Sequence, residues 1–297
     1  MTHIPVLLHE VVNILDPKPG EFFVDGTLGG GGYTAGILNR MNGTGKLLGI
    51  DLDSRMLFSA EERIKAIASP GIQVTFETGN YADLPAILEQ ENLEKADGIV
   101  LDLGFSSDQI AMSGRGFSFN HDEPLLMTYS DEATPVKELL RGMSESELRQ
   151  VIRTYGEERY AGRIAKAIKN RLRKSRIETS GELSEVVVGA LSKGYEHGRI
   201  HPATRTFQAF RIFANHELEN LETFLSELPR VLRPGGRVAI VSFHSLEDRI
   251  VKQSFKALAA AGSATLLTKK PITASPTEIE TNPRSRSAKL RAITFNQ

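Results

Sequence analysis

The chain has 297 residues, 40% of them hydrophobic, so it can bury a full core as one large domain or two smaller ones. Its 36 basic and 37 acidic residues leave a net charge of -1, so a nucleic-acid partner would have to meet a local basic surface. The absence of cysteine excludes disulfides, thiolate metal sites and a cysteine nucleophile. Without a membrane-length apolar run or an export signal, we expect a cytoplasmic protein with no membrane partner.

The first informative segment is a glycine-rich turn. A short apolar strand at 21–25 runs into four consecutive glycines, Gly29 to Gly32, and apolar residues then recur with helical spacing over 33–41. This pattern predicts a strand, a tight turn and a helix start, whose backbone N–H groups can approach a nucleotide-like ligand closely. A flexible turn without a ligand is the alternative interpretation.

The next predicted strand, 47–51, ends in Asp51. An acid about twenty residues after such a turn can bind the two hydroxyls of a ribose. Dinucleotide-binding enzymes and enzymes that use S-adenosylmethionine share this unit, so the residues alone leave both classes open.

The α/β rhythm continues as helix 54–67, strand 72–77, helix 83–90 and strand 98–102, which predicts a parallel sheet with helices on both faces. Asp102 closes the last of these strands at the carboxyl edge of the sheet, where open α/β folds bind ligands. We expect it to face both cofactor and substrate and to accept a proton; a capping carboxylate is the alternative.

Residues 106–213 contain no convincing strand. Ser144 with Glu147 and Thr179 with Glu182 have the spacing of capping boxes, and the segment is interpreted as a helical insertion.

The insertion contains a strongly basic stretch. Between Val136 and Arg176 there are twelve basic and five acidic residues, a balance of +7. Lys166, Lys169 and Arg173 are expected to project from the polar face of one helix and to contact RNA phosphates. A solvated charged face is the alternative.

After residue 213 the α/β pattern returns. We predict a helix at 214–228, a turn at 233–236, a strand at 238–241, and β segments at 265–268 and 289–295. His244 follows the strand, and Ser245 with Asp248 has capping-box spacing, so His244 is either held by local hydrogen bonds or relays a proton. Three further cations suit phosphate contacts, with ordinary surface charge as the alternative: Arg205, Arg284 and Arg286.

With these segments in view, the chain resembles the bacterial RsmH family, also called MraW. The resemblance spans nearly the whole chain and rests on motifs at 3–8, 25–32, 101–104, 115–119, 155–159, 201–209, 242–249 and 282–291.

The resemblance implies an α/β fold: a Rossmann-like class I methyltransferase domain at 1–106 and 214–297, interrupted by an all-helical domain at 107–213 that recognises RNA. It implies methyl transfer from S-adenosylmethionine to N4 of a cytidine in the decoding centre, the P-site region, of 16S rRNA in the small ribosomal subunit. Methyl transfer from a sulfonium is an in-line displacement that requires no metal. The sequence leaves open whether the protein forms a homodimer. The implied cofactor contacts are Gly31, Gly32, Tyr33, Asp51, Tyr81, Asp102 and Gln109.

Three departures from the family pattern stand out. Tyr33 replaces a usual His, Asp108 replaces a usual Pro, and the segment 126–129 lacks the usual acid and base. A non-catalytic rRNA-binding assembly factor that retains the fold is therefore the alternative. A dehydrogenase would need a hydride-transfer site that the sequence does not reveal.

Overall fold

The computed structural model describes residues 5–104, 114–192, 194–195 and 200–296. The chain forms two compact units, here called the sheet unit (1–106 and 218–297) and the helical unit (107–217). The boundary expected between 213 and 214 would cut helix α10 (Thr204–Asn215), whereas the division falls after Glu217.

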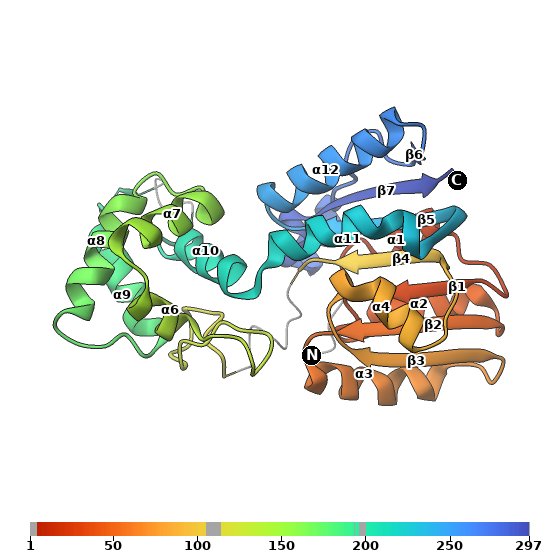
Figure 1. The fold of residues 1–297 in the computed structure, drawn as a ribbon, viewed down its shortest axis with the longest axis horizontal. Helices are drawn as coiled ribbons and strands as arrows, with labels where there is room; N and C mark the ends of the chain where they lie inside the picture. Colours follow the sequence, from red (N-terminus) through yellow and green to blue (C-terminus); the bar gives the residue numbers. More distant parts are fainter. Residues whose placement is uncertain (1–4, 105–113, 193, 196–199, 297) are drawn as a thin grey trace. The chain divides into compact units, whose positions relative to one another are not determined.

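The sheet unit is built on a seven-stranded sheet in the order β3-β2-β1-β4-β5-β7-β6 (Figure 1). Strands β1 to β5 pair in parallel, and β7 is antiparallel to both β5 and β6. This order confirms the predicted Rossmann-like α/β fold. The order in which successive strands are added to the sheet reverses between β1 and β4, which makes this the topological switch point. The strands are β1 (Phe22–Asp25), β2 (Gly45–Asp51), β3 (Ile72–Thr78), β4 (Ala96–Asp102), β5 (Leu232–Ser242), β6 (Ala264–Leu266) and β7 (Lys289–Phe295).

Helices cover both faces of the sheet because its central strands are apolar on both sides. Val24 and Ile99 face a core shared with α4, α11 and α12, whereas their neighbours Phe23 and Val100 face a core shared with α1, α2 and α3. The helices are α1 (Leu8–Leu15), α2 (Gly32–Met41), α3 (Ser54–Ile67), α4 (Leu84–Gln90), α11 (Glu217–Val231), α12 (Ser245–Ala260) and α13 (Pro276–Thr281).

Strand β5 begins earlier than predicted. The segment 233–236, expected to be a turn before the strand, lies inside it. The pairing with β4 passes from Leu232 opposite Ala96 to Arg237 opposite Gly98, so the extra residues form a bulge, with Gly235 at φ 78°. The predicted helix 214–228 is likewise displaced, to Glu217–Val231.

The helical unit packs its described helices around a core of its own, which includes Ile152, Ile164 and Phe210. Both predicted capping boxes are confirmed, at Ser144 with Glu147 and at Thr179 with Glu182. No helix in the described part of the chain is long and apolar enough to cross a membrane. The helices are α6 (Val136–Gly142), α7 (Glu145–Gly156), α8 (Ala161–Leu172), α9 (Ser180–Ala190) and α10 (Thr204–Asn215).

Gly98 on β4 lies directly opposite Phe23 on β1, and a Cβ at this glycine would be 2.1 Å from Cε1 of the phenyl ring. Gly98→Ala should therefore destabilise the sheet unit by about 1–3 kcal/mol through overpacking. Chemical denaturation measures this cost. Combining it with Phe23→Leu, which makes room for the methyl group, should recover part of it; strictly additive costs would contradict the contact.

Candidate active site

The glycine turn joins β1 to α2, and two of its glycines are required by the fold itself. Gly31, the N-cap of α2, has φ 71°, a left-handed conformation that favours glycine. A Cβ at Gly32 would lie 2.1 Å from Cγ of Pro5, so the N-terminal segment packs directly on the turn. Among the described residues, no acceptor pairs with the backbone N–H groups of Gly32 and Tyr33 in the first turn of α2.

Asp25, at the end of β1, lies fully buried behind this turn. Its carboxylate accepts hydrogen bonds from the Thr34 hydroxyl at 2.8 Å and the Thr27 backbone N–H at 3.3 Å. Burial raises the pKa of Asp25 to about 6, against the opposing effect of these donors. The carboxylate therefore fixes the turn to the first helical residues.

Asp51 ends β2 and turns toward the same loop. One carboxylate oxygen accepts from the Gly29 N–H at 2.7 Å, and the other from the Asp53 N–H at 2.9 Å. Burial raises the pKa of Asp51 to about 6. Because each carboxylate oxygen has two lone pairs, one on each remains for a ligand such as a diol.

Asp102 ends β4, the neighbour of β1. Its backbone N–H donates to the Thr27 hydroxyl at 2.6 Å, and its carboxylate accepts from the Gly104 N–H at 3.1 Å. Burial raises the pKa of Asp102 to about 7, with repulsion from Asp25 and Glu247 adding to the effect. A carboxylate that gains and loses a proton near neutral pH is suited to accept one from a substrate.

The two predicted tyrosines differ in setting. Tyr33 is buried, with 4% of the residue exposed, and its hydroxyl donates to the Val6 carbonyl at 2.5 Å. Tyr81, in the short 3-10 helix η1 (Tyr81–Asp83), is partly buried and packs edge-on against Phe224. A Cβ on Gly26 would lie 3.1 Å from the Tyr81 Cβ, so Tyr81 borders the glycine turn.

His244 is the N-cap of α12, which corrects the expectation that Ser245 and Asp248 form the capping box. Its Nδ1 accepts from the Glu247 N–H, and the Glu247 carboxylate accepts from the His244 N–H. Asp248 instead pairs with Arg291 on β7. His244 thus has a local structural role, and proton relay by it stays a prediction.

Fewer cations of the basic stretch are free of acidic partners than its composition indicates. Two acids that follow this stretch in the sequence, Glu178 and Glu182, pair with four of its cations: Lys137, Arg141, Arg171 and Arg176.

Lys169 is also occupied. Its ammonium donates to the Met143 carbonyl at 2.6 Å and the Leu140 carbonyl at 3.5 Å, so it caps the C-terminal end of α6. Lys166 on α8 and Arg173 at its C-cap remain exposed, and the Arg173 guanidinium donates a hydrogen bond to Asn170 Oδ1 at 3.2 Å. The structure therefore confirms an exposed polar face on α8, but the Lys169 ammonium on this helix is used to cap α6.

The other predicted phosphate-binding residues belong to elements other than α8. Arg205 is in the first turn of α10, and Arg284 and Arg286 are exposed on the 3-10 helix η3 (Pro283–Ser287) of the sheet unit. Gln109 and Asp108 lie outside the described residues.

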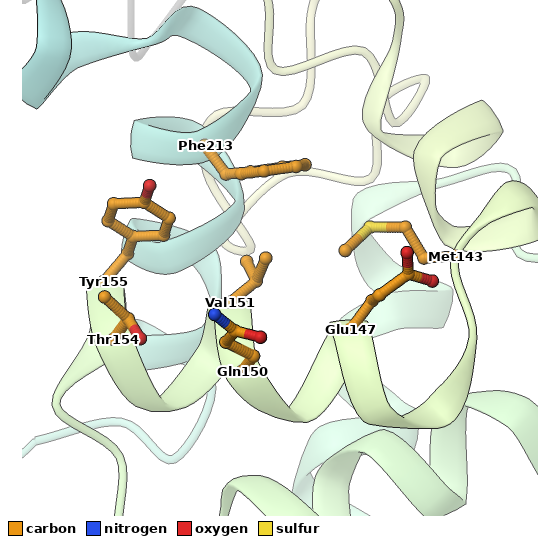
Figure 2. Close-up of a pocket in the computed structure, with 7 residues that line it drawn as sticks. All are labelled: Met143, Glu147, Gln150, Val151, Thr154, Tyr155 and Phe213. Atoms are coloured by element: carbon orange, nitrogen blue, oxygen red, sulfur yellow. The ribbon is translucent and has the colours of Figure 1, made fainter.

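A pocket of about 290 Å³ lies in the helical unit, chiefly between α7 and α10 (Figure 2). The aromatic rings of Tyr155 and Phe213, 6.1 Å apart, lie at one end, and the carboxylate of Glu147 lies toward the other. Hydrogen bonds from Ser144 lower the pKa of Glu147, so it stays ionised. The pocket is lined by Met143, Glu147, Gln150, Val151, Thr154, Tyr155 and Phe213.

The sequence interpretation missed two residues that organise the site, Asp25 and Thr27. Asp25 stands at the end of the strand just before the glycine turn, the same kind of position that singled out Asp51 and Asp102. Thr27 had no comparable signal, because its role depends on the pairing of β1 with β4.

The raised pKa of Asp102 predicts a stability cost at neutral pH. Between its unfolded value of 3.8 and about 7, the folded chain holds a proton that the unfolded chain has lost, so stability falls as pH rises through this window. Asp102→Asn should therefore increase the free energy of unfolding by roughly 1–2 kcal/mol at pH 8 and by much less at pH 4.

Asp248→Asn is the matched control for this denaturation experiment. Although burial opposes it, hydrogen bonds from Arg291 and Lys289 lower the pKa of Asp248. Its loss should destabilise the protein at pH 8, with the difference disappearing as pH falls below the usual Asp range. An Asp102→Asn variant that is less stable at pH 8 than the unsubstituted protein would contradict the prediction that ionised Asp102 destabilises the folded state.

The chain is similar in sequence to known methyltransferases. The sequence model of the MraW methylase family matches residues 1–296. The chain is 44% identical to a protein of Syntrophus aciditrophicus named ribosomal RNA small subunit methyltransferase H, over 97% of this chain and 96% of the relative. A relative of the same name from Symbiobacterium thermophilum is also 44% identical, over 98% and 96%.

Among solved structures, a putative rRNA-methylase from Clostridium thermocellum aligns with 98% of each chain at 12% identity and a TM-score of 0.48. The family match covers almost every residue, including the glycine turn and the strand ends that carry Asp25, Asp51 and Asp102. The chain belongs to the MraW methylase family.

Proposed function

We propose that this protein transfers a methyl group from S-adenosylmethionine to the exocyclic N4 of a cytidine in the decoding centre of 16S rRNA. Family membership and relatives named ribosomal RNA small subunit methyltransferase H support methylation of small-subunit rRNA. The observation that carries the finer proposal is the position of Asp102, a carboxylate with a pKa of about 7 beside the glycine turn.

The residues around the turn fit the cofactor. Asp51 keeps one lone pair on each carboxylate oxygen for the ribose hydroxyls, and the N–H groups of Gly32 and Tyr33 remain available at the positive end of α2. The bound cofactor supplies an electrophilic methyl group on a positively charged sulfur. Ionised carboxylates at the three strand ends favour such a cation.

The proposed chemistry needs alignment and a proton acceptor. Cytosine N4 is a weak nucleophile because its lone pair is delocalised into the ring, and a carboxylate that accepts a hydrogen bond from the amino group orients that lone pair. As the N–C bond forms, the amino group loses a proton, which Asp102 accepts. Methylation of cytosine C5 generally begins with a cysteine thiolate adding to C6, and this chain has no cysteine.

Recognition of the RNA is assigned to the helical unit. The pocket beside Tyr155 and Phe213 combines aromatic rings with amide and carboxylate groups, a combination that suits an unstacked base. Exposed Lys166 and Arg173 on α8 supply charge for phosphates.

The non-catalytic alternative rests on the departures at 126–129, and these residues pack within the helical unit. The Thr128 carbonyl accepts from the buried Arg115 guanidinium, and the Tyr129 ring stacks on Phe117. The segment thus has a structural role without the usual acid and base, and only a transfer experiment separates the two functions.

The direct test is methyl transfer to small ribosomal subunits that lack the modification, followed by mass spectrometry of the nucleosides. We expect N4-methylcytidine, and we expect Asp102→Ala to lose most turnover, on the order of a hundredfold or more, because the proton acceptor is gone. A product on C5 or on another base would refute the proposal. RNA binding without any transfer would favour the assembly factor.

RNA binding by α8 predicts a salt dependence. Replacing Lys166 and Arg173 together with Gln should weaken binding and reduce the slope of log affinity against log salt by about one per lost phosphate contact. The matched control replaces Lys137 and Arg176, whose charges face Glu178. Fluorescence anisotropy with an rRNA fragment over a salt series measures the affinity and its salt dependence for both variants. Equal effects of the two double substitutions would show that the polar face of α8 is an ordinary solvated surface that does not bind RNA.

A further inference from the structure

The pocket between α7 and α10 carries an acid at one end of its lining. Glu147 extends from the first turn of α7, and the buried Val151 lies one turn further along the same face of that helix. One carboxylate oxygen of Glu147, Oε2, accepts from the Ser144 backbone N–H at 2.6 Å, which belongs to the capping box of α7. An ionised carboxylate has about four acceptor positions, so several remain for a ligand in the pocket.

The other end of the pocket is aromatic. The rings of Tyr155 and Phe213 are partly buried, and their planes are tilted by 39° with the centroids 6.1 Å apart (Figure 2). Flat ring surfaces of this kind stack with nucleic-acid bases. The volume of about 290 Å³ is at the lower end of the range for small-molecule sites, which fits a single base.

The charges around the pocket favour a neutral ligand. Aromatic rings with a carboxylate can also bind an arginine or lysine side chain of a protein. The Lys169 ammonium, however, donates to the carbonyl of Met143, a lining residue, at 2.6 Å. A positive charge therefore already lies beside the pocket and repels a second cation, whereas it does not repel a neutral base.

We propose that this pocket binds a guanine of the substrate RNA, whose N1–H and N2 amino group donate to the Glu147 carboxylate while its ring stacks on the aromatic end. This inference deepens the proposed function and rests on it, because it gives the helical unit a part in choosing the rRNA sequence.

Guanine is favoured because it is the RNA base with two adjacent donors on its Watson–Crick edge. Cytosine and adenine each have a ring-nitrogen acceptor beside the amino group, and uracil has a carbonyl on either side of its N–H. Each of these three bases would therefore direct a lone pair toward the second oxygen of the carboxylate. Bases in unpaired RNA are commonly bound in this way, by stacking and by hydrogen bonds to the Watson–Crick edge.

The test follows the Met143 methyl group by NMR in the full chain labelled with ¹³C-methyl methionine, because this side chain lines the pocket. Its signal is assigned by its absence in Met143→Leu. Short uridine-rich RNAs that carry one guanosine, one adenosine or one inosine are titrated. We expect the guanosine RNA to shift the signal and to bind at least about tenfold more tightly than the adenosine RNA. Inosine lacks the N2 amino group and should bind about tenfold more weakly than guanosine, because one hydrogen bond to a charged group is lost.

Glu147→Gln separates recognition of the base from folding of the helix. Glutamine also completes a capping box with Ser144, so α7 should keep its cap, but its amide presents a donor to a donor of guanine. The preference for guanosine over adenosine should disappear. Glu145→Gln is the matched control, since this exposed acid in the same turn does not line the pocket, and the preference should remain.

Three results overturn the inference. The first is equal affinity for the guanosine and adenosine RNAs, and the second is a preference that survives in Glu147→Gln. The third is a Met143 signal that shifts with an arginine-rich peptide and with none of the RNAs, which would make the pocket a site for a basic protein segment.

Methyl transfer to small ribosomal subunits, measured separately, distinguishes this inference from the proposed function. If the guanosine preference holds and the protein methylates cytidine N4, both stand. If the preference holds and no methyl group is transferred, the proposed reaction fails and the pocket remains the guanine site of an RNA-binding protein. If transfer occurs and the preference is absent, the inference fails and the proposed function stands.

Discussion

The site depends on one constraint, which is that three carboxylates, two of them buried and that of Asp102 partly buried, are held at adjacent strand ends of a parallel sheet. Asp51, Asp25 and Asp102 close β2, β1 and β4, which lie side by side in that order. Burial of a charge costs free energy, and N–H and hydroxyl donors at Thr27, Gly29 and Thr34 offset part of that cost by hydrogen-bonding the carboxylates of Asp25 and Asp51. The glycine turn is therefore shaped as much by its own acids as by a ligand.

Much of the sheet could be predicted from the sequence because its strands are apolar on both sides and its turns are marked by glycine. The bounds of β7 and the end of β4 at Asp102 agree with the structure. The early start of β5 could not be predicted, because Pro234 and Gly235 usually end a strand, and only the bulge against β4 accommodates them. The His244 cap was missed because histidine is an uncommon N-cap and Ser245 offered the usual one.

The site could be predicted in part, for a similar reason. An acidic residue at the end of a predicted strand can be recognised in the sequence, and this pattern predicts Asp51 and Asp102 as site residues. Pairing between distant segments is not visible, so the basic stretch looked more available than it is. Glu178 and Glu182 lie just C-terminal to the basic stretch, and the capping of α6 by Lys169 depends on how two helices pack. Net charge along the chain is a weaker guide to a binding surface than the partners of each cation.

If ionised carboxylates hold a cationic cofactor, affinity must depend on their protonation, and calorimetry of S-adenosylmethionine binding between pH 7.5 and pH 5 tests this most directly. With pKa values of about 6 for Asp51 and about 7 for Asp102, the affinity should fall at least about tenfold over this range, with protons released on binding near pH 6. Asp51→Asn should bind more weakly at pH 7.5 and show a smaller dependence on pH. Equal affinity at pH 7.5 and pH 5 would contradict the account.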